Sequence, residues 1–72
     1  MTKQEFIEKM KDEVLDTEND ISLDIPLENL EEWDSLSFVS FIAMAKESGF
    51  TQVNRDVVNK AVTVGDLFAL VK

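Results

Sequence analysis

Ser35 is the residue of this chain whose position best suits chemistry. It lies in the tetrapeptide Trp33-Asp34-Ser35-Leu36, where a strongly acidic stretch meets a largely apolar one. Asp34 is a good helix N-cap, which puts Ser35 beside free backbone N–H groups and the positive end of a helix dipole. This setting favours a phosphate ester on the serine hydroxyl. The residues alone leave two interpretations: Ser35 is modified, or Ser35 simply begins a helix.

Composition limits the chemistry that the chain can perform. The 72 residues contain neither cysteine nor histidine. A Ser-His-Asp or Cys-His catalytic set is therefore impossible, and the usual thiolate and imidazole metal ligands are missing. We predict a single domain over residues 1–72 that is not an enzyme and has no metal site.

The charge is strongly negative and concentrated in one stretch. The formal net charge is −8, from 15 acidic and 7 basic residues, and eight of the acids lie from Asp16 to Asp34 with no base among them. Such a surface repels nucleic acid and anionic lipid and attracts basic patches, although it can also serve solubility alone. No signal-peptide core or membrane-spanning stretch is visible. We predict a cytoplasmic protein that binds neither nucleic acid nor membrane.

Apolar periodicity predicts an all-α four-helix bundle with three longer helices, a short third helix and a long loop between the first two. The expected helices cover residues 3–16, 35–48, 55–60 and 64–71. The expected N-terminal caps are Thr2 with Glu5, Asp34, Asn54, and Thr63 with Asp66.

The connection over 17–33 is long for a compact domain, which is more often a functional feature. It has room for a short helical turn near 27–32. Its apolar residues are expected to pin it to the core: Ile21, Leu23, Ile25, Leu27 and Leu30. Trp33 suits a further hydrophobic anchor for this loop.

The second helix has three arcs at about 100° per residue. The arc expected to face the core holds Phe38, Phe41, Ile42 and Ala45. The second arc holds Leu36, Val39 and Ala43 and is a candidate contact surface unless the loop covers it. The third arc holds Ser37, Ser40, Met44 and Glu47.

The stretch Trp33-Asp34-Ser35-Leu36-Ser37-Phe38-Val39-Ser40-Phe41-Ile42 resembles the prosthetic-group site of the acyl carrier proteins. The chain length, the order of the helices and the closing stretch Thr63-Val64-Gly65-Asp66-Leu67 also resemble this family. The resemblance implies that a phosphopantetheinyl transferase (holo-synthase) attaches 4′-phosphopantetheine from coenzyme A to Ser35. The thiol of this arm then holds an acyl or aminoacyl group as a thioester, consistent with the missing cysteine.

The same resemblance assigns roles to further residues. Asp34 and Leu36 are the flanking recognition positions. The partner-facing positions are Val39, Ser40 and Ala43. The acyl-pocket positions are Phe38, Phe41, Ile42 and Ala45. Beyond the transferase, the implied partners of this monomer are an acyl- or aminoacyl-loading ligase and an acceptor transferase or synthase with a basic patch.

Some positions depart from the fatty-acid carriers. Those proteins typically have acids where this chain has Ser37 and Ser40, and an acidic third helix where this chain has Arg55 and Lys60 beside Asp56. The position of Trp33, directly before Asp-Ser-Leu, resembles the pattern of stand-alone specialised carriers. We therefore expect a specialised biosynthetic pathway, with a short or polar cargo because Phe38 and Phe41 narrow the pocket.

Two alternatives stay open. A D-alanyl or other aminoacyl carrier shares the Asp-Ser core, whereas peptidyl carriers usually have Gly-Gly-x-Ser in place of the Glu32-Trp33-Asp34-Ser35 found here. A non-carrier acidic helical protein-interaction module would use the loop and the second arc for docking. In that case Ser35 only begins a helix.

Overall fold

The chain is all-α, and the computed structural model describes residues 1–72. Its α-helices are α1 (Lys3–Lys9), α2 (Ser35–Glu47), α3 (Arg55–Asn59) and α4 (Val64–Leu70). A π-helical segment, η1 (Met10–Val14), continues α1, and a 3₁₀ turn, η2 (Leu27–Asn29), lies in the first long loop. These elements match the predicted ranges except at their ends. No helix is long and apolar enough to cross a membrane.

The helices begin where side chains satisfy free backbone N–H groups. Thr2 Oγ1 accepts from Glu5 N at 3.1 Å, and Glu5 Oε1 accepts from Thr2 N at 3.2 Å. Thr63 and Asp66 form the same reciprocal pair at the start of α4, and the Asn54 side chain caps α3. All the predicted caps at these three helices are confirmed.

The end of the first helix is wider than the sequence predicts. Leu15 N donates to Met10 O at 2.7 Å, a bond that spans one residue more than in an α-helix. The helical path then stops at Asp16, whose φ of 51° is left-handed. With this wider turn, the consecutive residues Val14 and Leu15 are both buried together with Met10.

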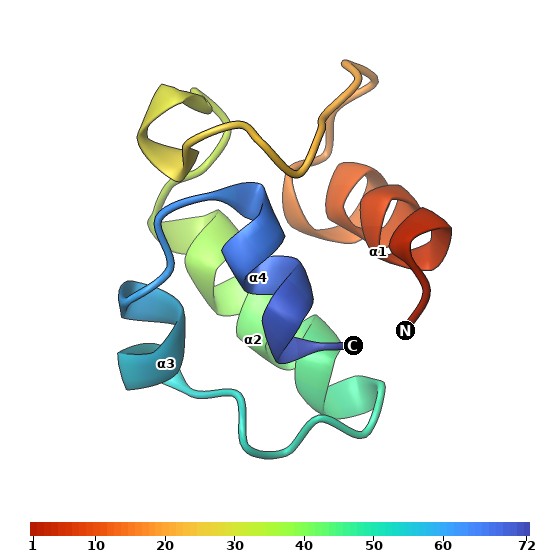
Figure 1. Ribbon diagram of the computed structural model, residues 1–72, viewed down its shortest axis with the longest axis vertical. Coiled ribbons are helices and arrows are strands. Elements are labelled where there is room, and N and C mark those ends of the chain that lie inside the picture. The colour runs from red at the N-terminus through yellow and green to blue at the C-terminus, as the bar shows by residue number, and fades with distance from the viewer.

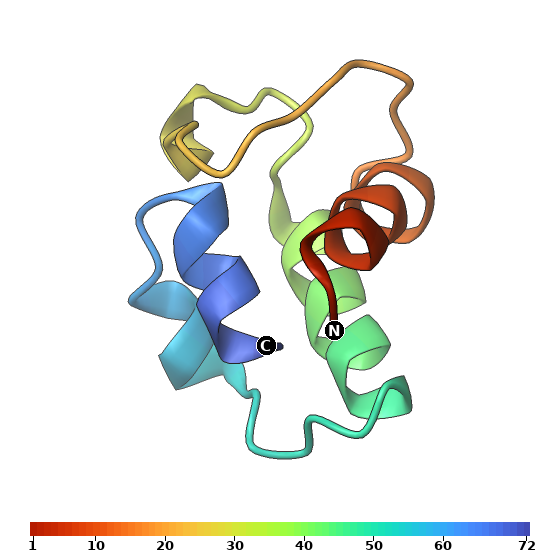
Figure 2. The ribbon, with the colours of Figure 1, turned by 45° about the vertical axis from the view of Figure 1, so that its right-hand side comes forward.

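The core draws on every helix. Its largest fully buried side chains are those of Phe6, Phe41, Met10 and Leu67. In Figure 1, α4 lies in front of α2 at the centre, with α1 on one side and α3 on the other. Figure 2 shows the first long loop passing over one end of this arrangement, from the end of the first helix to the start of α2.

The long loop docks on the start of α4. Three backbone hydrogen bonds hold it: Gly65 N to Leu23 O at 2.8 Å, Val64 N to Ile25 O at 3.0 Å, and Leu27 N to Val62 O at 2.8 Å. Leu27 is buried, and the other apolar loop residues pack partly buried against the core. The prediction that these residues pin the loop is confirmed. A fixed loop gives α2 a defined starting point.

Candidate functional site

Ser35 is the first residue of α2, and its side chain is exposed. The Asp34 side chain caps the helix by accepting from Ser37 N at 3.0 Å, as predicted. This hydrogen bond lowers the pKa of Asp34, so the cap is a carboxylate at neutral pH. None of the side-chain hydrogen bonds at this junction involves Ser35 Oγ. The site therefore presents, at a helix N-terminus, a hydroxyl that makes no side-chain hydrogen bond.

Ser37 ties the loop to α2. Its side chain is buried, with 4% of the residue exposed, and Ser37 Oγ donates to Glu32 O at 2.6 Å. Ser37 Oγ also lies 3.3 Å from Asp34 Oδ1. These contacts join Ser37 to two residues that precede Ser35, so Ser37 helps to fix the backbone on which Ser35 lies.

Ser37 and Met44 were placed on the third arc of α2, apart from the arc expected to face the core, but both are buried. The buried face is centred on Phe41, and residues four before, three after and four after it share that face of a helix. Those positions are Ser37, Met44 and Ala45. Ser37 and Met44 therefore belong to the buried face of α2.

Trp33 anchors the loop immediately before the cap. Its ring centroid lies 6.3 Å from that of Phe38 and 6.5 Å from that of Phe41, the latter in an edge-on arrangement. Trp33 and Phe38 flank the cap at the positions of a hydrophobic staple, which sets the angle at which a chain enters a helix. The predicted anchoring role is confirmed.

The second arc of α2 is uncovered. Leu36 is 77% exposed, Val39 is 49% exposed, and Ala43 is exposed as well. Ser40, the remaining partner-facing position, is half-buried. The loop therefore does not cover this arc, and an apolar surface borders Ser35.

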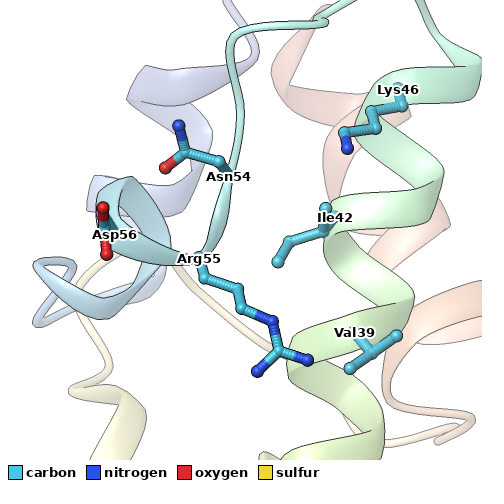
Figure 3. A pocket seen from close by; sticks show the side chains of 6 residues that line it. All are labelled: Val39, Ile42, Lys46, Asn54, Arg55 and Asp56. Carbon is cyan, nitrogen blue, oxygen red and sulfur yellow. The ribbon is translucent and has the colours of Figure 1, made fainter.

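A groove of about 540 Å³ lies between α2 and the start of α3 (Figure 3). Val39, Ile42 and Lys46 form its α2 wall, and the other wall is the segment Asn54–Asp56. Residues four, seven and eleven positions after Ser35 fall on the same face of a helix as Ser35 itself. These are the three groove residues of α2, so the groove continues the helix face that starts at Ser35.

The predicted acyl-pocket residues do not surround one cavity. Ile42 lines the groove, whereas Phe41 and Ala45 are fully buried in the core and Phe38 packs against Trp33. Sequence reasoning missed Lys46 and Arg55 as groove residues. The helical spacing from Ser35 could have identified Lys46, but nothing local in the sequence places Arg55 opposite α2.

The arrangement offers an exposed hydroxyl at the start of a helix. The chain has no group of three or more histidine, cysteine, aspartate or glutamate side chains that could hold a metal ion. What the site can do chemically is accept a group on Ser35 Oγ from another molecule and present that group beside the groove.

In comparisons with known proteins, the chain matches no family model, no curated protein and no solved structure.

Proposed function

We propose that this chain is a carrier protein that holds acyl groups as thioesters on a 4′-phosphopantetheine arm attached to Ser35. The observation that carries the proposal is the Ser35 hydroxyl at the start of α2. It is exposed, makes no side-chain hydrogen bond, and lies on the same helix face as the α2–α3 groove. The resemblance of the surrounding stretch to the acyl carrier proteins supplies the identity of the arm.

The surroundings of Ser35 fit such a group. The N-terminus of a helix with 13 residues favours a phosphodiester, since its first N–H groups and dipole attract negative charge. The groove volume of about 540 Å³ lies within the range of small-molecule sites. The N-terminus of α2 can therefore hold the phosphodiester of an arm on Ser35, and the groove offers a surface along which the arm can lie.

Attachment requires one exchange of phosphate bonds. Ser35 Oγ forms the new bond to phosphorus, the pyrophosphate bond of coenzyme A breaks, and adenosine bisphosphate leaves. The serine proton passes to a base of the phosphopantetheinyl transferase, because the chain has no histidine to accept it. The bound arm then supplies the thiol that the chain itself lacks.

Partner enzymes would meet the exposed arc of Leu36, Val39 and Ala43 beside the arm. Apolar surface at the centre of a contact supplies affinity, and acidic surroundings attract a basic patch. In this proposal the partners are the transferase, a loading ligase and an acceptor transferase or synthase. The carrier acts as a monomeric four-helix bundle over residues 1–72, in a specialised pathway of the cytoplasm.

A second candidate is a non-carrier protein-interaction module. The exposure of Leu36 and Val39 beside an acidic loop favours it, because this surface can bind a partner without any modification. In that case Ser35 only begins α2. The two candidates differ in whether Ser35 becomes modified.

Intact mass separates these candidates. The purified apo protein is incubated with coenzyme A and a promiscuous phosphopantetheinyl transferase, and we expect a gain of one phosphopantetheine group. Ser35→Ala should show no gain, whereas the control Ser48→Ala, an exposed serine at the end of α2, should gain it fully. No gain by the unmodified sequence, or a gain that survives Ser35→Ala, overturns the carrier proposal.

A further inference from the structure

Resting on the proposed carrier function, we propose that Arg55 is the counter-ion of the phosphodiester on Ser35 and directs the arm into the α2–α3 groove. Arg55 then positions the prosthetic group and takes no part in its transfer. The direction of the Arg55 side chain and the distribution of bases along the chain point to this role.

The stretch of chain around Ser35 offers no cationic side chain to a phosphodiester. Residues 12–45 contain neither lysine nor arginine, whereas acids are frequent in the loop before Ser35. The Asp34 carboxylate, next to Ser35, is engaged in the cap of α2 through Ser37 N. A negative group added to Ser35 thus enters an acidic neighbourhood. Apart from the free N–H groups of α2, its compensating charge comes from another part of the chain.

Arg55 reaches the face of α2 on which Ser35 lies. Figure 3 shows its side chain extending from the start of α3 across the groove, with the guanidinium beside Val39. Val39 follows Ser35 by four residues, so the two share one face of α2 and are separated by a rise of about 6 Å. The guanidinium therefore lies about one helical turn along α2 from Ser35, and a phosphate on Ser35 Oγ extends into this interval.

Position, rather than the lack of an ion pair, singles out Arg55. The two ion pairs of the chain involve Lys9 and Lys11, so the other bases are equally free of an ionic partner. Lys46, the other base that lines the groove, lies about 16 Å along α2 from Ser35. Figure 3 shows Lys46 at the opposite end of the groove from the guanidinium. Arg55 is therefore the groove cation at the end that leads to Ser35.

The fold holds the backbone of Arg55 in place. Arg55 is the first residue of α3, and Asn54 caps this helix by accepting from Val57 N at 3.0 Å. Val53 and Val58, on either side of Arg55, are buried in the core. The Arg55 side chain itself is exposed, so its guanidinium can adjust to a phosphate while the backbone stays fixed.

The guanidinium suits a phosphodiester. Its N–H groups form a planar fork that binds two oxygens of one phosphate, and arginine keeps its charge at physiological pH. Asp56 is the one acid among the groove-lining residues, and Figure 3 shows its carboxylate turned away from α2. No acid that lines the groove therefore lies between Arg55 and α2 to compete with the phosphodiester.

The test compares the apo and holo forms of matched variants. The promiscuous transferase loads Ser35 from coenzyme A in the unmodified sequence, in Arg55→Gln, in Arg55→Lys and in the control Lys60→Gln, and intact mass verifies complete loading. Lys60→Gln deletes an equal, exposed charge at the other end of α3, so it reports the general effect of losing one charge.

Phosphorus magnetic resonance gives the direct readout, because the phosphodiester on Ser35 is the one phosphorus of the holo form. We expect Arg55→Gln to shift this signal and Lys60→Gln to leave it in place. Arg55→Lys keeps the charge but loses the planar fork, so it should restore the signal in part. In the unmodified sequence, the Arg55 Nε–H signal should shift when Ser35 is loaded.

Thermal unfolding gives the second readout. Loading adds a negative charge to a protein of net charge −8, which by itself lowers the melting temperature. In Arg55→Gln, the change in melting temperature on loading should lie roughly 1–4 °C below that of the unmodified sequence. Lys60→Gln should show the same change as the unmodified sequence. Added salt should reduce the difference, since the pair is exposed.

The outcomes separate the role of Arg55 from the carrier proposal. Failure to load the unmodified sequence contradicts the carrier function itself. Complete loading with an unmoved Arg55 Nε–H signal, or with the same phosphorus signal in Arg55→Gln, overturns the role of Arg55 and leaves the carrier intact. Slow loading of Arg55→Gln with an unchanged phosphorus signal assigns Arg55 to recognition by the transferase and likewise overturns the inference. If Arg55→Gln cannot be loaded, the Nε–H signal of the unmodified sequence decides alone.

Discussion

Ser37 Oγ donates a hydrogen bond to the carbonyl oxygen of Glu32 at 2.6 Å, which joins the end of the long loop to the first turn of α2. The bond spans the four residues Trp33, Asp34, Ser35 and Leu36, so it holds the candidate modification site between two fixed points. A buried hydroxyl at this position therefore supports the site although it performs no chemistry itself.

Replacing Ser37 by alanine should destabilise the fold. The substitution leaves the partly buried Glu32 carbonyl without its donor, which costs about 1–3 kcal/mol. Urea unfolding would measure the change in the free energy of unfolding. Ser40→Ala is the matched control on the same helix, because Ser40 is only half-buried and we expect a change within about 0.5 kcal/mol. Equal effects of the two substitutions would contradict the role of the Ser37 bond.

Gly65→Ala should loosen the contact between the long loop and α4. A Cβ at this position would lie 3.0 Å from the carbonyl oxygen of Leu23, which already accepts from Gly65 N at 2.8 Å. The loop must shift, so we expect a loss of about 1–2 kcal/mol and faster hydrogen exchange at the Gly65 amide.

The helix propensity of alanine acts in the opposite direction, which makes the sign of the Gly65→Ala effect informative. Ala69→Gly, at an exposed position of the same helix, measures the propensity difference and should cost about 1 kcal/mol. If Gly65→Ala stabilises the protein by a similar amount, the close approach of the loop has no energetic consequence.

Acidification should weaken the cap of α4. Val62 N and Thr63 N donate to Asp66 Oδ2 at 2.9 and 3.1 Å, and these bonds lower the pKa of Asp66 in the folded state. A lowered folded-state pKa contributes stability above the unfolded-state pKa, and this contribution is lost as the pH falls through the folded-state pKa.

The measurement for this cap is the difference in free energy of unfolding between the unmodified protein and Asp66→Asn as a function of pH. The difference should be largest at neutral pH and should shrink as the pH falls through and below the ordinary pKa of an aspartate, about 3.9. Asp24→Asn is the control, because no side-chain hydrogen bond holds the exposed Asp24. If the difference in free energy of unfolding between the unmodified protein and Asp66→Asn does not change with pH, the charge of the Asp66 cap is excluded as its cause.

Leu36→Ala should slow modification of Ser35 without weakening the fold. Leu36 is 77% exposed, so its loss should change the free energy of unfolding by no more than about 0.5 kcal/mol. If the transferase buries this side chain, losing it should reduce the rate of arm transfer at limiting carrier concentration roughly tenfold.

Val62→Ala is the control for this surface, since Val62 is an exposed apolar residue before α4 and does not belong to the second arc of α2. We expect its transfer rate to stay close to that of the unmodified protein. Time-resolved intact mass measures both rates. Similar slowing by both substitutions would show that the arc beside Ser35 has no special part in recognition.

The sequence by itself determined the helix starts and the exposure of Ser35. Thr2, Asp34, Asn54 and Thr63 cap their helices through contacts with residues three positions away, so these choices depend only on local chemistry. The attachment of the long loop to the core also followed from its composition, because burial of apolar side chains such as Leu27 removes their surface from water.

Only the tertiary structure decided which side of α2 is buried and which residues line the groove opposite α2. Ser37 and Met44 are buried because the first helix, with its wider final turn, packs on that side of α2, a contact between segments far apart in the sequence. Arg55 lies across the groove from α2 because the connection after α2 brings α3 back along it. Local spacing carries no information about either placement, since both depend on how separate helices bury their apolar faces against one another.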